Sequence, residues 1–442
     1  MSRVFGAREI YESGQLVVAL PYEDFVCREL NRLATSRYAS VADRSELLGL
    51  ALVEIEDTDA VPDKLLVHYP DFEMDQAYTR SPNAIDRILA LLRHHFDRTL
   101  EGYVPEMGKN RVAQVRGEPY VDGGGEGDPD PAEAAGWDIR PGGEGKGISI
   151  GVFDTQIDDE HPYFADKTVE TRPQDRLRRT GGPPKHTEGH STMITGIILR
   201  EAPGAGVTVR QVLDSVASVN AWTLAKALAD FAWQAPDLLN LSLGELHTDD
   251  GRTPLIFEAI VRLFPNTLIL AAGGNHGNID PGKMPGLPQG LSRSAPTWPA
   301  AMPEVVSVGS LTADMKLAPF TPKIVPAGAE EPVAPPWLRY GICGVQVRGT
   351  YLRGEVSIER RGPMGQLLVD LRTKNGKTIP NPEPREFPKD GYATWSGASF
   401  ATARLTGIVA RTMAANRLKG RSGALKALDM LTPQDGILKF NP

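Results

Sequence analysis

A hydroxyl, an imidazole and a carboxylate stand in this sequence where they could act as a nucleophile, its base and an orienting acid. Ser399, in GYATWSGASFATA, precedes a helical pattern. The N–H groups and dipole at a helix N-terminus favour a developing oxyanion, although a serine there is more often a simple N-cap. A serine nucleophile needs a base, and all eight histidines precede Ser399. The order serine, acid, histidine is therefore excluded, while His-Asp-Ser and Asp-His-Ser remain open.

Asp154 and His190 are the candidate partners of this serine. Asp154 ends the apolar run of ISIGVFDTQID, and open α/β sheets build their sites at the carboxyl ends of parallel strands. His190 begins a helical pattern in EGHSTMITGII, after a loop rich in glycine, proline and basic residues. Taken singly, each has a simpler interpretation, as a turn-capping aspartate and as a surface histidine.

Five segments in a fixed order give these residues a joint meaning. They are VFDTQID, GHSTMITGII, NLSLGE, AAGGNHGN and YATWSGASFATA, which contain Asp154, His190, Ser242, Asn275 and Ser399 in turn. In this order the sequence resembles the subtilisin-like (S8) serine peptidases over roughly residues 147–430. The resemblance implies a subtilisin-like α/β fold and peptide-bond hydrolysis.

The resemblance also implies roles for individual residues. Ser399 would be the nucleophile, His190 the general base and then acid, and Asp154 the group that orients the imidazole. Asn275 and the Ser399 backbone N–H would bind the oxyanion. Two segments would flank the backbone of an extended peptide substrate by β-addition. These segments are Ser242, Leu243 and Gly244, and Ala272, Gly273 and Gly274.

Several neighbouring positions depart from the usual residues of the family, but none of the departures removes a catalytic group. The resemblance implies no required cofactor. Secreted relatives carry structural calcium, and no motif locates a calcium site in this sequence. The departures are Ser191-Thr192, Met193, Ile342-Cys343-Gly344, Ala398 and Ala403-Arg404.

Alternating strand and helix patterns must position these groups. From residue 147 to residue 442 this alternation predicts a mainly parallel sheet with helices on both faces. A β-rich insertion is predicted at 352–390, with strands at 355–359 and 366–372, a turn at Asn375-Gly376 and later prolines that exclude regular structure. The other predicted strands are 148–153, 207–213, 238–243 and 267–272, and the predicted helices are 191–199, 221–233, 255–264 and 399–416.

The first 116 residues have a different pattern, with the order β-α-β-β-α-β. This order predicts a small α+β domain of the split βαβ, ferredoxin-like type. Residues 117–146 are rich in Gly, Pro and acidic residues and predict an exposed linker, either a tether or a protease-accessible activation segment. The predicted strands are 16–20, 48–55, 65–68 and 111–115, and the predicted helices are 22–33 and one that begins at Ser81 and Pro82.

Two functions of residues 1–116 remain open. Many relatives carry a propeptide of this β-α-β-β-α-β order that assists folding and blocks the cleft. The alternative is a retained domain that senses a signal or binds a regulatory protein partner. In both cases we expect residues 1–116 to control access to Ser399.

Length and composition bound the remaining possibilities. The 442 residues predict two or three domains, and 41% hydrophobic with 24% charged residues excludes a disordered chain. The net charge of −8 argues against a general nucleic-acid or anionic-membrane binder. Two cysteines, Cys27 and Cys343, cannot form a disulfide framework or a four-cysteine zinc site. Without a signal-peptide pattern or a membrane-length apolar run, we expect a cytoplasmic protein.

Two other functions compete with a serine endopeptidase that works through an acyl-enzyme. A zinc hydrolase could use His186 and His190, but its motif places Glu directly after the first histidine, and here Glu188 lies two positions on. We therefore predict no metal site. A catalytically degenerate peptidase fold could act as a binding or regulatory module. The presence of the complete set argues against that alternative; its members are Asp154, His190, Asn275 and Ser399.

Overall fold

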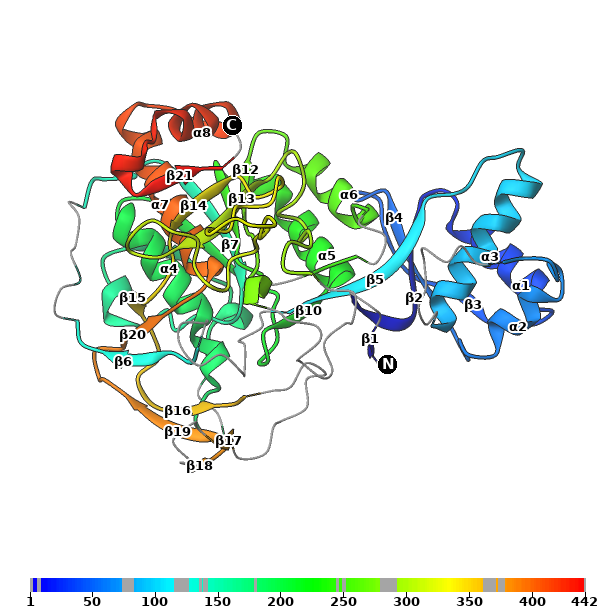
Figure 1. The fold of residues 1–442 in the computed structure, drawn as a ribbon, viewed down its shortest axis with the longest axis horizontal. Helices are drawn as coiled ribbons and strands as arrows, with labels where there is room; N and C mark the ends of the chain where they lie inside the picture. The colour runs from blue at the N-terminus through cyan, green and yellow to red at the C-terminus, as the bar shows by residue number, and fades with distance from the viewer. Residues whose placement is uncertain are drawn as a thin grey trace.

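The computed structural model describes residues 3–5, 9–73, 83–114, 127–134, 137, 142–178, 181–243, 246–248, 252–278, 292–360, 371–372 and 378–440. Two large sheets organise these residues: a central sheet formed by residues 149–439, and an N-terminal sheet formed mainly by residues 3–114 (Figure 1). We refer to residues 142–440 as the C-terminal region. In the described ranges, no helix is both long enough and apolar enough to cross a membrane.

The central sheet has eight strands, and all neighbouring pairs are parallel except one pair at an edge. The predicted mainly parallel α/β sheet is therefore confirmed, with strands at each of the four positions expected from the apolar runs. In spatial order the strands are β21 (Ile437–Lys439), β14 (Tyr340–Cys343), β13 (Val306–Leu311), β12 (Leu268–Ala272), β11 (Leu238–Leu241), β7 (Ser149–Asp154), β9 (Gly206–Gln211) and β8 (Thr168–Glu170).

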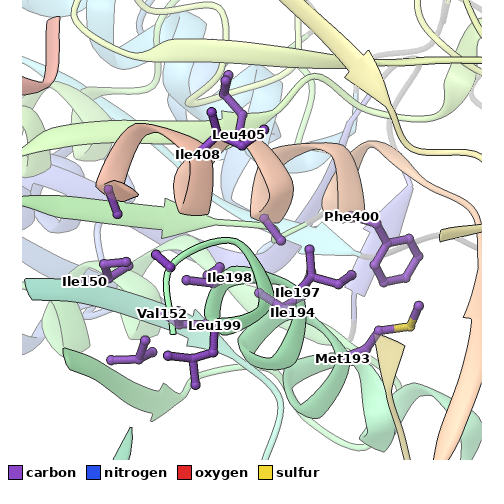
Figure 2. Close-up of a cluster of buried hydrophobic side chains, with 14 of the residues drawn as sticks. Ile150, Val152, Met193, Ile194, Ile197, Ile198, Leu199, Phe400, Leu405 and Ile408 are labelled. Atoms are coloured by element: carbon purple, nitrogen blue, oxygen red, sulfur yellow. The ribbon is translucent and has the colours of Figure 1, made fainter. Parts of the chain in front are cut away.

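Helices cover both faces of the central sheet. Because successive residues of a strand point to opposite faces, neighbouring residues pack against different helices. Leu238 packs in one cluster with α4, α7 and α8, whereas the next residue, Leu239, packs with α5 and α6. Figure 2 shows the first cluster, in which side chains of α4 and α7 meet those of Ile150 and Val152 on β7. The helices are α4 (His190–Glu201), α5 (Ala221–Phe231), α6 (Leu255–Leu263), α7 (Ala398–Ala415) and α8 (Gly420–Met430).

Short 3-10 turns connect several of these elements. They lie at η1 (Pro162–Phe164), η2 (Pro173–Asp175), η3 (His186–Gly189), η4 (Ala232–Gln234), η5 (His276–Asn278) and η6 (Pro433–Asp435). The turn η3 matters for the site because it leads directly into α4 and His190.

The insertion forms a hairpin of β16 (Gly354–Ile358) and β19 (Glu383–Phe387), with the short pair β17 (Leu371–Arg372) and β18 (Thr378–Ile379). The prediction that prolines keep this part out of regular structure is wrong, because Pro384 lies inside β19, opposite Ser357. A two-stranded hairpin tolerates proline, since an edge strand has positions where no N–H is needed. The predicted turn Asn375-Gly376 and most of the predicted strand 366–372 lie outside the described residues.

A small sheet joins the insertion to the segment before the central sheet. Its order is β15 (Val347–Thr350), β20 (Tyr392–Trp395) and β6 (Asp130–Ala132), all antiparallel. The predicted linker, 117–146, therefore contains a paired strand in its described part, while residues 117–126 lie outside the described residues.

The N-terminal sheet is antiparallel and has the order β10-β5-β2-β4-β3, with β1 also paired to β2. Its first five strands and three helices give the predicted β-α-β-β-α-β order, extended by β1 and α2. The sixth strand, β10 (Ser218–Asn220), belongs to the C-terminal region and pairs with β5. The elements are β1 (Arg3–Phe5), β2 (Ile10–Ala19), α1 (Glu23–Leu33), β3 (Ala39–Ser45), β4 (Leu50–Ile55), α2 (Val61–Leu66), α3 (Ala84–Thr99) and β5 (Met107–Gln114).

One N-terminal strand was assigned to the wrong residues. The predicted strand 65–68 is wrong: Leu65 and Leu66 end α2, which has Pro62 in its first turn. The second strand is instead β3, whose alternating polar residues on a sheet edge give a weak apolar pattern. The predicted start of α3 at Ser81 and Pro82 lies outside the described residues, and the structure begins α3 after Asn83.

The N-terminal sheet is covered on both faces. Val53 and Ile55 of β4 pack with α1 and α3, whereas Leu50 and Leu52 pack in one cluster with α5 and α6. In Figure 1, β5 runs from the N-terminal helices towards α5 and β10. The face that carries Leu50 is therefore buried by the C-terminal region.

Candidate active site

The three predicted catalytic residues lie at element ends that the central sheet brings together. Asp154 is the last residue of β7, His190 the first of α4 and Ser399 the second of α7. All three are at most 2% exposed. The ring of Phe400, the residue after Ser399, has its centre 5.5 Å from that of the His190 imidazole. Segments that are 36 and 209 positions apart in the chain therefore meet at one place.

The contact between His190 and Asp154 fixes the imidazole. His190 Nδ1 lies 2.8 Å from Oδ1 and 2.9 Å from Oδ2 of Asp154. The carboxylate also accepts the Thr155 backbone N–H at 2.7 Å. A carboxylate at Nδ1 selects the tautomer in which Nδ1 carries the hydrogen, which leaves Nε2 as the acceptor. In the described structure this Nε2 is buried and has no hydrogen-bond partner.

The serine segment is held by a chain of buried polar groups behind it. Ser242 Oγ donates to the Ser399 carbonyl oxygen at 3.0 Å, and Asn240 Nδ2 donates to Ser242 Oγ at 3.0 Å. Thr406 Oγ1 lies 3.0 Å from Asn240 Oδ1. The side chain of Ser242 thus contacts the serine segment, and contact of its backbone with substrate stays a prediction.

The serine lies in the first turn of α7. Gly397 donates its N–H to the Gly344 carbonyl at 2.8 Å, and α7 starts at the next residue. No acidic residue occupies the first turn of α7. The positive end of the helix dipole therefore lies at Ser399.

Asn275, the predicted oxyanion residue, is tied to this same helix start. Its side-chain oxygen accepts the Ala398 backbone N–H at 2.9 Å, and the residue is 3% exposed. This bond places the Asn275 amide within one residue of Ser399. An amide held so close to a nucleophile is suitably placed to stabilise negative charge on a substrate oxygen.

The other predicted substrate-binding residues lie at the ends of β11 and β12. Leu243 is buried in the cluster with α5 and α6, and Gly244 lies outside the described residues. Ala272 ends β12, and Gly273 donates its N–H to the Val308 carbonyl at 2.8 Å. Gly274 has φ +95°, and a Cβ there would lie 2.8 Å from His276 Nδ1, so this turn needs glycine.

His186 and His190 bond to different partners and do not form a shared metal site in the described structure. Its Nδ1 accepts the Glu359 backbone N–H at 3.2 Å, so it contacts the insertion, whereas His190 Nδ1 contacts Asp154. Desolvation lowers the pKa of His186 to about 4, which keeps it neutral near pH 7. Among the described residues, no group of three or more His, Cys, Asp or Glu side chains is arranged to hold a metal ion.

Two residues around the site were not predicted from the sequence. Asn240 is a polar residue inside the apolar strand LLNL, and a buried polar group in such a strand signals a specific hydrogen bond. Trp395 lies four positions before Ser399, and its ring meets that of His190 edge to face, with centres 5.8 Å apart. An aromatic residue so close to a nucleophile was the available signal.

Comparisons with known proteins agree with this arrangement. Residues 145–436 match the model of the subtilase family, Peptidase_S8. Thermitase of Thermoactinomyces vulgaris is 28% identical over 193 residues, which are 39% of this chain and 57% of thermitase. The fold is similar to that of fervidolysin from Fervidobacterium pennivorans, with a TM-score of 0.52, 14% identity, and coverage of 92% of this chain and 55% of fervidolysin. The match to thermitase thus spans little more than half of that relative.

Proposed function

The chain belongs to the subtilase family of serine-type peptidases, and from that premise we propose that it is an endopeptidase with Ser399 as its nucleophile. Ser399 Oγ attacks the carbonyl carbon of the scissile peptide bond while His190 Nε2 takes its proton. His190 then gives this proton to the leaving amine, which leaves an acyl-enzyme on Ser399. Water, activated by the same imidazole, hydrolyses the ester and restores the enzyme.

The other groups of the site stabilise charge during these steps. Asp154 orients the imidazole and stabilises the imidazolium, and the Asn275 amide with the Ser399 N–H stabilises the oxyanion. The observation that carries the proposal is the pairing of His190 Nδ1 with both oxygens of Asp154, which leaves Nε2 as the proton acceptor. The ring of Phe400, the residue after Ser399, packs against the same imidazole. The expected substrates are proteins or peptides, bound as extended chains.

Control by residues 1–116 is part of the proposal. The N-terminal sheet is packed on α5, and residues 127–134 are attached to the C-terminal region through β6. Gln114 ends β5, so residues 115–126 connect two attached parts. We expect any self-processing cut in these twelve positions, a narrower window than the predicted linker 117–146.

Labelling and intact mass test the proposal together. The wild-type protein should react with a fluorophosphonate at Ser399 and hydrolyse a protein substrate. Ser399→Ala should lose both, with turnover lower by about six orders of magnitude, a figure that comes from a subtilisin. Ser396→Ala, three positions earlier, is the matched control and should keep both activities, since Ser396 Oγ accepts the Gln346 N–H at 2.9 Å and has no part in the proposed mechanism.

Three outcomes separate the alternatives. Hydrolysis retained by Ser399→Ala would refute the assignment of the nucleophile. Absence of labelling and of hydrolysis in the wild-type protein, with the N-terminal part removed, would favour a degenerate fold that acts as a binding module. A mass that shows a cut in 115–126 in wild type but not in Ser399→Ala indicates a cleaved propeptide, and an uncut active protein indicates a retained regulatory domain.

A further inference from the structure

Residues 127–134 are attached to the C-terminal region next to the proposed catalytic histidine. Strand β6 pairs with β20, with Asp130 opposite Thr394 and Ala132 opposite Tyr392. After β6, the Ala134 N–H donates to Asp390 Oδ2 at 3.2 Å. Strand β20 ends at Trp395, four residues before Ser399, so the segment lies against the strand that leads to the nucleophile.

An ion-pair cluster from the insertion strengthens this attachment. Arg360 Nε donates to Asp128 Oδ2 at 2.9 Å, and Arg360 also pairs with Glu383. Arg385 donates to the Pro129 carbonyl at 2.9 Å and to Asp130 Oδ1 at 3.2 Å. The side chains of Arg360 and Asp128 are only 11% and 21% exposed, so this pair is less screened than a surface pair.

Trp395 links the segment to the histidine. Its indole N–H donates to the Gly127 carbonyl at 2.8 Å, and the residue is 6% exposed. The same indole meets the His190 ring edge to face, at a centroid distance of 5.8 Å and an interplanar angle of 89°. The indole of Trp395 is thus hydrogen-bonded to Gly127 and also contacts the imidazole.

The imidazole needs such a contact because its hydrogen bonds to Asp154 are all on one side. A ring held only at Nδ1 can tilt about that contact, and a tilt moves Nε2 relative to the nucleophile. Trp395 and Phe400 pack against the His190 ring, and their own ring centres are 5.3 Å apart. Small misplacements of a catalytic group cost large factors in rate.

We propose that Trp395 is a positioning residue for His190, and that residues 127–134 hold its indole through the Gly127 carbonyl. The proposal rests on the proposed function, since it assigns His190 as the base. It also requires that residues 127–134 stay attached after any cut in 115–126. The insertion then has a function, because Arg360 and Arg385 keep this segment in place.

The first test is Trp395→Phe in the full-length protein, with kcat and KM measured for one peptide substrate. Phenylalanine keeps an aromatic ring near His190 but removes the N–H that binds the Gly127 carbonyl. We expect kcat to fall roughly 5- to 30-fold with KM changed less than twofold, because the change acts on the transition state. The rate of fluorophosphonate labelling should fall in parallel.

Trp222→Phe is the matched control, since the Trp222 indole donates to Asp43 Oδ2 at 3.0 Å. Trp222 packs in the cluster with α5 and α6, whereas the side chains of α4 pack in the other cluster. This variant should leave kcat and KM within twofold of wild type.

Asp128→Asn is a second variant that weakens the ion-pair cluster without changing any residue that contacts His190. It should lower kcat roughly 2- to 5-fold and increase hydrogen exchange at the backbone amides of Asp130 and Ala132. Glu133→Gln, an exposed change in the same segment, should do neither.

Each outcome decides the proposal. A wild-type kcat in Trp395→Phe, or an increase in KM alone, would overturn it, because the tryptophan would then be dispensable or would contact substrate. Faster exchange at Asp130 and Ala132 with unchanged kcat in Asp128→Asn would show that the segment does not act on the histidine. Hydrolysis retained by Ser399→Ala refutes the proposed function itself, which is a separate result.

Discussion

The N-terminal third of the chain meets the C-terminal region by strand addition twice, in opposite directions and with different chemistry. At the first contact, β10 of the C-terminal region extends the N-terminal sheet, and Leu50 and Leu52 pack with α5 and α6. At the second, β6 extends a small sheet of the C-terminal region, and an ion-pair cluster holds it there. Residues 115–126 lie between the two contacts.

The difference indicates which contact can be released. The first is a broad apolar face on a folded sheet, and nothing but the connecting chain joins that sheet covalently to the C-terminal region. A cut in 115–126 would leave it as a non-covalent complex, held by burial of apolar surface and by the pairing of β5 with β10. The second contact would stay covalently joined to the C-terminal region. We therefore expect the first to control access to the site and the second to support its geometry.

Leu50→Ala should have the largest effect on the first contact. Leu50 is 1% exposed and packs with the C-terminal region, so its truncation removes buried surface and leaves a cavity. The expected loss is about 2–5 kcal/mol in the attachment of the N-terminal sheet. Leu50→Ala is made in the full-length Ser399→Ala protein and compared with Ser399→Ala alone. Denaturant unfolding and hydrogen exchange at β5 measure the loss of stability.

The control for this change is Leu47→Ala, three positions earlier and 65% exposed, which should leave the exchange of β5 unchanged. Exchange at β6 should be the same in both variants, since β6 belongs to the second contact. Equal loss of protection at β5 and β6 in Leu50→Ala would contradict the separation of the two contacts.

The sequence predicted the parts of the molecule whose pattern is local. Asp154 ends an apolar strand and Ser399 begins a helix, and each position follows from the residues beside it. The predicted strand 65–68 is the end of α2, because a short apolar segment such as LLVH fits a helix as well as a strand. The strand β3 was not predicted, because it is a polar strand at the sheet edge. Short apolar runs do not distinguish a strand from a helix.

The two strand additions could not be predicted from the sequence, for a different reason. β10 and β6 have three residues each, and each pairs with a strand more than 100 positions away in the chain. Their partners are chosen by the packing of whole sheets, which no local pattern records. The role of Trp395 was missed for the same reason, since Gly127 lies 268 positions before it.

Acidification should destabilise the packing of His186 against the insertion, which carries the ion-pair cluster of the second contact. Burial lowers the pKa of His186 from 6.5 to about 4, Arg360 acts in the same direction, and Asp128 and Glu359 oppose it. The unfolded chain therefore binds a proton that the folded chain does not bind between about pH 6.5 and 4, and stability falls as the pH falls through this range. Protonation of Nδ1 also removes the acceptor of the Glu359 N–H.

Between pH 7 and pH 4, titration of His186 should lower the free energy of unfolding by about 2–3 kcal/mol, after allowance for its partial exposure. Unfolding of the Ser399→Ala protein across this range measures it, against the same protein with His186→Gln. Glutamine offers an oxygen to the Glu359 N–H without titrating, so its stability should fall less on acidification. An identical fall in both proteins would show that His186 does not contribute.

Trp222→Phe should have the smallest effect and gives the closest comparison between the two contacts. The indoles of Trp222 and Trp395 each donate one hydrogen bond to the N-terminal third of the chain, to Asp43 and to Gly127. Asp43 has a side chain that is 43% exposed, so the loss from Trp222→Phe should be only about 1 kcal/mol, seen as faster exchange at β5 and β10. Its kcat should stay at the wild-type value, whereas Trp395→Phe should change kcat and leave the exchange of β5 unchanged. A fall of kcat in Trp222→Phe would mean that the first contact also acts on the geometry of His190. The two contacts would then not have separate functions.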